Sequence, residues 1–139
     1  MRNRTQSREF ALQMLYQADI RHTGVGEVAE TFWDEYDPPQ EVKAFANELF
    51  AGTIRHLQEI DPLIADRADN WNLKRMAVID RNILRLGVFE LLHAADVPPK
   101  VCINEAIELA KRFGDAESSK FINGILDAIH KKTHAQPDR

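Results

Sequence analysis

Three closely spaced arginines near the N-terminus could bind phosphate groups. Arg2, Arg4 and Arg8 all precede the first acidic residue, Glu9. Guanidinium groups pair with phosphate through two hydrogen bonds and stack on bases, so such a group suits single-stranded RNA. A solvated N-terminal tail is the competing interpretation, because short runs of charge are common. The spacing alone leaves both interpretations open.

A second candidate pair, Lys120 and Phe121, places a cation beside an aromatic ring. It lies at the predicted start of the last helix, where free backbone N–H groups attract phosphate. Phe121 could stack on a base. It also begins the apolar face that Ile125 continues, and such spacing more often indicates a core position.

Glu90 and His93 have the E-x-x-H spacing with which carboxylate-bridged di-iron bundles place two ligands on one helix face. Those bundles need two such units, and the nearest second match, Asp127 to His130, lies at a predicted helix end. We therefore expect no metal ion and no other cofactor, and we interpret Glu90 and His93 as surface or capping groups. A di-iron helical protein is the enzyme-class alternative.

Several function classes are excluded by what the sequence lacks. It has no phosphate-binding glycine loop, no H-E-x-x-H and no G-x-S-x-G motif, so we expect no enzyme. Cys102 is the only cysteine, which rules out an intramolecular disulfide and favours a reducing, cytoplasmic location. No apolar run approaches the roughly 18 residues of a membrane span, so we expect no membrane partner.

The charge is unevenly distributed along the chain, whose net charge is -4. No lysine or arginine lies between Arg21 and Lys43, a stretch rich in acidic residues. Such a segment should repel phosphate and suits a basic partner protein.

These side chains must be positioned by helices, because the hydrophobic spacing is helical nearly everywhere. The sequence predicts an all-α fold of six or seven helices with short connections. We expect Asp61 and Pro62 to begin a short helix, as an N-cap and a first-turn proline. Asp80 is expected to cap the central helix, with a partner contact as the second interpretation. The helix boundary near Asp80 stays open.

The longest specific motif is the run from Val101 to Gly114, with Lys120 to Leu126 after it. It closely resembles the C-terminal signature of the NusB family. Asp80 to Leu86 looks like that family's central helix, and Arg8 to Tyr16 is similar to its opening helix. The resemblance covers most of the chain and is weakest from residue 21 to 41.

This resemblance implies a single NusB domain over residues 1–139. Its NusB-type fold would have two three-helix-like subdomains, at about residues 1–70 and 71–139, that share a core. It also implies an RNA-binding transcription antitermination factor. Such a factor would bind boxA-type leader RNA jointly with NusE, a ribosomal small-subunit protein, within the transcription elongation complex, and would support rRNA operon transcription.

By motif position, Arg4 and Arg8 match the family's arginine-rich RNA-binding terminus, to which we add Arg2. Lys120 with Phe121 match its second RNA-facing patch. Tyr16 and Asp80 match positions associated with the partner protein. Because Thr5 and Gln6 stand where arginines are frequent in the family, we expect weaker RNA affinity or a greater dependence on NusE.

The main alternative is a protein of the same fold that acts as a protein-interaction or dimerisation module with little RNA binding of its own. The acidic net charge and the thinned arginines favour it, and a homodimer would then be expected. The N-terminal domain of an RNA methyltransferase is another relative, but no cofactor-binding glycine loop follows in this sequence.

Overall fold

The computed structural model describes residues 2–21, 24–68 and 73–133. Over these residues it contains seven α-helices, one 3-10 turn and no strand, which confirms the all-α prediction. The elements are α1 (Arg2–Arg21), α2 (Val25–Glu35), α3 (Gln40–Arg55), α4 (Leu57–Arg67), η1 (Leu73–Arg75), α5 (Val78–His93), α6 (Pro99–Phe113) and α7 (Ser118–Thr133).

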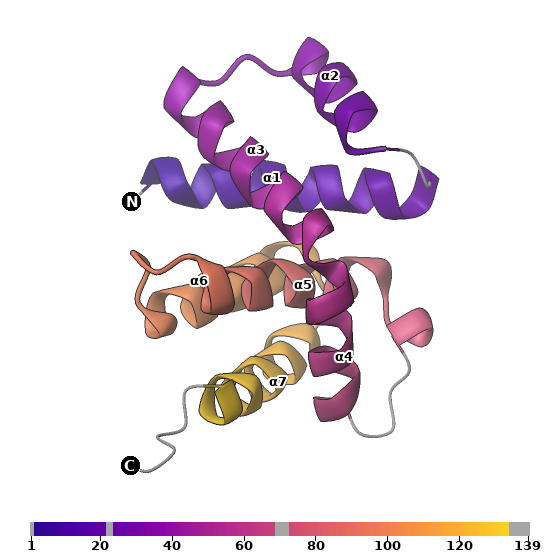
Figure 1. The fold of residues 1–139 in the computed structure, drawn as a ribbon, viewed down its shortest axis with the longest axis vertical. Coiled ribbons are helices and arrows are strands. Elements are labelled where there is room, and N and C mark those ends of the chain that lie inside the picture. Colours follow the sequence, from indigo (N-terminus) through magenta and orange to yellow (C-terminus); the bar gives the residue numbers. More distant parts are fainter. Residues whose placement is uncertain (1, 22–23, 69–72, 134–139) are drawn as a thin grey trace.

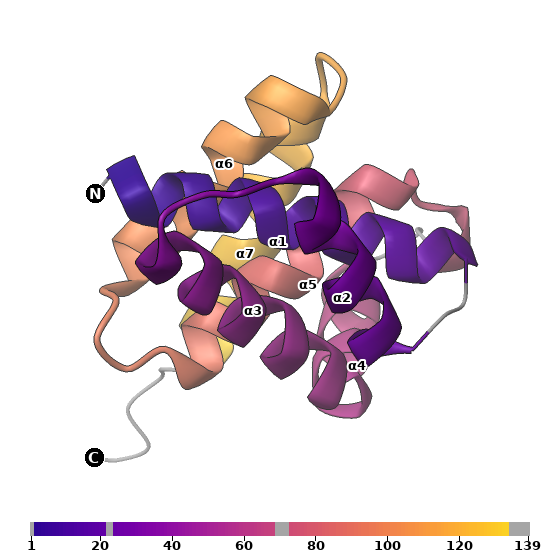
Figure 2. The same cartoon turned by 90° about the horizontal axis from the view of Figure 1, so that it is seen from above.

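Helix α1 crosses the middle of the molecule, with α2 and α3 on one side and α5, α6 and α7 on the other (Figure 1). Seen from above, α1 runs between α3 and α6 (Figure 2). Its buried side chains cover more than one face, because Ala11, Leu12, Met14 and Leu15 are each almost fully enclosed. One hydrophobic cluster extends from α1 to α7, so all the helices contribute to a shared core.

The packing of α4 bears on how the chain divides. Helix α4 precedes residue 70, yet it packs against α5 and α7 as well as α3. In Figure 1 it lies beside these C-terminal helices. A division into subdomains near residue 70 stays a prediction.

Prolines set two of the helix boundaries. Pro38 and Pro39 separate α2 from α3, and Pro99 is the first residue of α6. Proline suits the first turn of a helix because the N–H it lacks has no partner there.

The predicted helix start at Asp61 and Pro62 is wrong. Helix α4 begins at Leu57, and Pro62 lies inside it. The Asp61 carboxylate instead accepts hydrogen bonds of 2.9 and 2.9 Å from the guanidinium of Arg85 on α5. The residue that resembled a cap therefore joins two helices.

The capping role expected for Asp80 is also wrong. Ala77 occupies the N-cap position of α5, and Asp80 lies in the first turn. The helix boundary near Asp80, which the sequence left open, lies at Val78, where α5 begins after the short turn η1. The Asp80 carboxylate is therefore available for another contact than capping the start of α5.

Candidate nucleic-acid interface

Arg4 is held on the surface at the N-terminal end of α1. Its guanidinium carbon lies 4.2 Å from the ring centroid of Phe45 on α3, and its Nη1 is 3.4 Å from a carboxylate oxygen of Asp96. The side chain remains 44% exposed. Arg4 is therefore oriented by its neighbours and still open to an incoming phosphate.

Arg8 lies inside the protein, unlike Arg4 one turn earlier. Its side chain is 2% exposed, and Nε and Nη2 each donate a hydrogen bond of 2.8 Å to Glu90. A Glu105 oxygen lies 3.5 Å from Nη1. In this structure the guanidinium is enclosed in a structural ion pair, which disfavours the predicted RNA contact of Arg8; that contact stays a prediction.

The neighbouring carboxylates stabilise the positive charge of Arg8. Burial by itself would lower the pKa of Arg8, but the hydrogen bond and charge of Glu90, with the charge of Glu105, outweigh burial and raise it. Glu90 is 2% exposed and so is neither a surface nor a capping group, contrary to expectation. Because Arg8 occupies its carboxylate, the E-x-x-H spacing with His93 does not provide a metal site.

Arg2 is the first residue of α1, but its side chain lies outside the part of the chain that the structure describes.

Lys120 and Phe121 lie in the first turn of α7 and line a hollow between the segment before α5, the start of α5 and the start of α7. Lys120 is exposed, and Phe121 is half-buried against the core, which confirms its core position. Base stacking by Phe121 stays a prediction. We call this the α7 hollow; it is lined by Met76, Ala77, Asp80, Asp115, Glu117, Ser118, Lys120 and Phe121.

Tyr16 and Asp80 meet at an adjoining hollow beneath α1. We call this the α1 hollow; it is lined by Tyr16, Ala77, Val78, Ile79, Asp80, Phe113, Gly114, Asp115 and Ser118. Four residues line both hollows: Ala77, Asp80, Asp115 and Ser118. The structure therefore brings the predicted partner residues Tyr16 and Asp80 next to the predicted RNA residues Lys120 and Phe121, whereas Arg4 lies apart beside Phe45 and Asp96.

Asp80 has an unusual environment in the wall between the two hollows. Its Oδ1 is buried and has no hydrogen-bond partner within the described part of the chain. Burial raises the pKa of Asp80; the Ser118 hydroxyl opposes this, and the negative charge of Asp115 adds to it. An unpaired buried carboxylate oxygen costs free energy, so a donor from a partner would be favoured here.

Ile20 is an exposed apolar residue near the C-terminal end of α1. It is 49% exposed, and Tyr16 one turn earlier is 38% exposed. The two side chains extend an apolar strip along α1 from the α1 hollow. The strip was missed because α1 carries apolar residues around most of its circumference, so periodicity does not separate core from surface.

Comparison with known proteins decides what this arrangement belongs to. A family model described as the NusB family matches residues 5–131. The chain belongs to the NusB family. The transcription antitermination protein NusB of Syntrophus aciditrophicus is 44% identical over 138 residues, which cover 99% of this chain and 86% of that protein. NusB of Myxococcus xanthus is 48% identical over 131 residues, covering 91% of this chain and 93% of that protein.

Solved NusB structures have the same fold. NusB of T. maritima superposes with a TM-score of 0.84 at 37% identity, covering 93% of this chain and 91% of that one. A chain from a crystal structure of the antitermination factors NusB and NusE in complex with dsRNA superposes with a TM-score of 0.85 at 31% identity, covering 95% of this chain and 98% of that one. These matches confirm the NusB-type fold.

Membership of the NusB family also identifies a transcription antitermination factor and not an enzyme, as the sequence predicted. Over the described residues, no helix has the length and hydropathy needed to span a membrane.

A partly buried polar network fixes α1 of this NusB-family chain against α5. A single Asp19 oxygen accepts hydrogen bonds from Arg81 at 3.0 Å and Arg85 at 3.2 Å. The Asn82 amide donates a third, at 3.0 Å. Burial would raise the pKa of Asp19, but the hydrogen bonds from Asn82 and Arg81 and the two positive charges lower it. This network holds the C-terminal half of α1, and with it Tyr16, over the start of α5.

Proposed function

We propose that this protein binds RNA jointly with NusE, at boxA-type leader sequences, and so supports antitermination of rRNA operon transcription as part of the elongation complex. The observation that carries the proposal is the likeness, over 95% of the chain, to the NusB of a complex with NusE and dsRNA. The surfaces of this chain suggest how the two partners are divided between them.

The α1 hollow is the proposed NusE surface. The hollow brings the exposed ring of Tyr16 together with the buried, unpaired oxygen of Asp80, and Ile20 adds exposed apolar area beside it on α1. An aromatic anchor beside a polar group that lacks a partner is typical of the centre of a protein interface. Asp115 and Glu117 on the neighbouring wall add negative charge, which suits a basic protein better than phosphate.

RNA contacts are proposed at Arg4 and Arg2 on one side and at Lys120 and Phe121 on the other. Arg4 supplies a partly exposed guanidinium, and Lys120 an exposed ammonium at the N-terminus of α7. The half-buried ring of Phe121 offers an edge or face for one base. Because these contacts are few and far apart, the chain alone should bind RNA weakly. NusE bound beside Lys120 and Phe121 would add further RNA contacts.

Fluorescence anisotropy tests the proposal with a boxA-like RNA and a scrambled control, each with and without NusE. We expect sequence-selective binding that NusE strengthens at least tenfold. Arg4→Ala, Lys120→Ala and Phe121→Ala should weaken RNA binding. Tyr16→Ala should weaken NusE binding and leave the residual affinity for RNA alone unchanged.

Arg55→Ala is the matched control. Arg55 is an exposed arginine at the end of α3, whereas Glu41 at the start of α3 bonds Asn3 beside Arg4. Arg55→Ala removes one positive charge, as Arg4→Ala does, but at the end of α3 that lies away from Arg4. Weak, unselective RNA binding that NusE does not change would instead support the interaction-module function, and light scattering would then show whether the chain forms a homodimer.

A further inference from the structure

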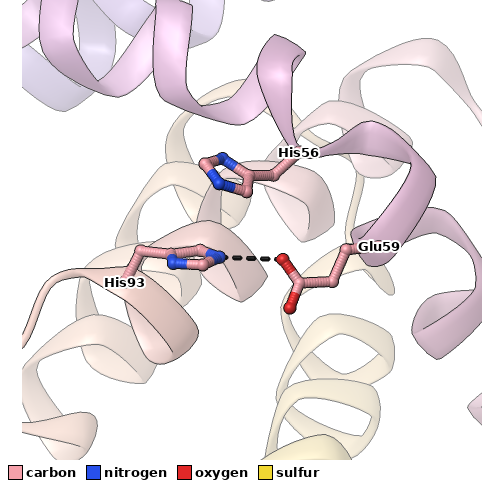
Figure 3. Close-up of side chains that lie close together, drawn as sticks. All are labelled: His56, Glu59 and His93. Atoms are coloured by element: carbon pink, nitrogen blue, oxygen red, sulfur yellow. Dashed lines mark hydrogen bonds and ion pairs between the residues drawn. The ribbon is translucent and has the colours of Figure 1, made fainter.

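Two histidines and a glutamate come together on the face where α3 ends, α4 begins and α5 ends. His56 is the residue between α3 and α4, Glu59 lies in the first turn of α4, and His93 is the last residue of α5. Figure 3 shows the three side chains converging, with the imidazole of His56 next to the hydrogen-bonded pair of His93 and Glu59. This cluster is separate from both hollows and from Arg4.

The geometry of the cluster is close. One ligand atom from each residue lies within 4.8 Å of the other two. His93 Nε2 is 2.8 Å from Glu59 Oε1, and the two imidazole centroids are 4.1 Å apart. Around a tetrahedral zinc ion with bonds of roughly 2.0–2.2 Å, ligand atoms are about 3.4 Å apart, so small side-chain rotations would complete the site.

His56 is already oriented as a metal ligand would be. Its Nδ1 is 2.8 Å from the carbonyl oxygen of Gly52. Because a carbonyl only accepts, Nδ1 carries the proton and Nε2 keeps its lone pair. A hydrogen bond from the second ring nitrogen to a backbone carbonyl is the usual outer contact of zinc-bound histidine. The ring of Phe89 lies against both imidazoles, with centroids 5.7 Å from His56 and 5.5 Å from His93.

We propose that His56, Glu59 and His93 bind one divalent transition-metal ion, zinc by preference. Two imidazoles and one carboxylate are a zinc ligand set that leaves the fourth position to water. The side chains of Glu59 and His93 are 50% and 32% exposed, so the ion has a path from solvent. Imidazole ligands favour zinc and its neighbours over magnesium or calcium.

Metal binding would join the α3–α4 junction to the end of α5. In the structure His93, at the end of α5, is held to this junction by one exposed hydrogen bond to Glu59 and by ring contact with His56, while the Arg85–Asp61 pair joins α4 to α5 further along. A bound ion would replace that hydrogen bond with coordination by three residues. It should therefore stabilise the folded state by an amount that rises with the logarithm of the free metal concentration once this exceeds the dissociation constant.

The test uses the chain of residues 1–139, without a tag, after metal removal. We expect isothermal titration with Zn²⁺ to give one ion per chain, and Co²⁺ to give the visible absorption bands of a four-coordinate site. Thermal unfolding should shift upward with Zn²⁺ but not with Mg²⁺. His56→Gln, Glu59→Gln and His93→Gln should each lower zinc affinity by about tenfold or more.

His130→Gln, which removes a histidine of α7 outside the cluster, is the matched control and should bind zinc as the parent does. Circular dichroism checks that each variant is folded, and Glu59→Gln, at a half-exposed position, provides the reading if a histidine variant unfolds. Zinc binding that Glu59→Gln and His93→Gln leave unchanged, or no binding at micromolar zinc, would overturn the proposal.

Discussion

Arg8 and Glu90 form an ion pair that is almost closed to water, with both side chains 2% exposed. In Arg8→Ala the carboxylate of Glu90 would stay buried without its partner. We expect the free energy of unfolding to fall by about 3–5 kcal/mol, measured by urea denaturation.

The double variant Arg8→Met with Glu90→Leu is the control for this prediction. It removes both charges and keeps apolar volume, so it should recover much of the loss. If Arg8→Ala reduced RNA binding while stability stayed unchanged, Arg8 would be an RNA ligand after all.

The Asp80 carboxylate destabilises the folded protein, although we propose that it binds the partner. Its raised pKa means that the folded state disfavours the carboxylate. The penalty is absent below the unfolded pKa of about 3.9, grows as the pH rises through the folded pKa, and is complete above it. Asp80→Asn should therefore raise the melting temperature at pH 7 and have little effect at pH 3.

The same substitution should weaken NusE binding, because the carboxylate is the proposed acceptor for a partner donor. Asp127→Asn on α7 is a matched control, since that carboxylate is half exposed and pairs with Lys131. A stabilised Asp80→Asn protein with full NusE affinity would remove Asp80 from the partner surface.

At the scale of elements, Asp19 connects α1 to α5 through Asn82, Arg81 and Arg85. Because its pKa is lowered, it stabilises the fold above the unfolded pKa of about 3.9, and that contribution is lost as the pH falls through the folded value. Asp19→Asn should destabilise the protein by about 2 kcal/mol at pH 7. The difference from the parent should disappear in strongly acidic solution, which denaturation at a series of pH values would show.

The helices could be predicted from the sequence because each apolar face has a helical period and prolines separate α2 from α3 and α5 from α6. The partners of charged residues could not. Asp61 has the local pattern of a helix cap, but Arg85, 24 residues later, determines its role. Arg8 matched a basic terminus, and only the approach of Glu90, 82 residues away, shows that it is buried.

The candidate surfaces were predictable to different degrees. Motif resemblance singled out Tyr16, Asp80, Lys120 and Phe121 as candidate site residues. The structure adds that they line two adjoining hollows. The His56, Glu59 and His93 cluster has no local motif, because its members come from three separate segments. Pairing across such distances depends on helix packing, which hydrophobic period does not encode.

At the scale of the whole molecule, a net charge of -4 makes RNA binding depend on a few local cations. For single strands, the logarithm of the binding constant falls with the logarithm of salt concentration with a slope of roughly -0.7 per phosphate contact. Arg4→Ala should therefore make the slope shallower by about 0.7, as measured by anisotropy across a salt series with NusE present. Arg55→Ala should leave the slope unchanged, and a slope that Arg4→Ala did not alter would place the phosphate contacts elsewhere.

The central position of α1 has a consequence for how the chain is made. Glu9 is bonded by Arg112, 103 residues later, and Thr5 bonds Glu105, 100 residues later. At roughly 5–20 residues per second, α1 waits several seconds after leaving the ribosome for these partners to be synthesised. During that interval only α2 and α3 can cover the apolar faces of α1. The core can therefore be completed only after α5 and α6 have been synthesised. Slowing translation before α5 should therefore prolong the exposure of α1 to chaperones and proteases.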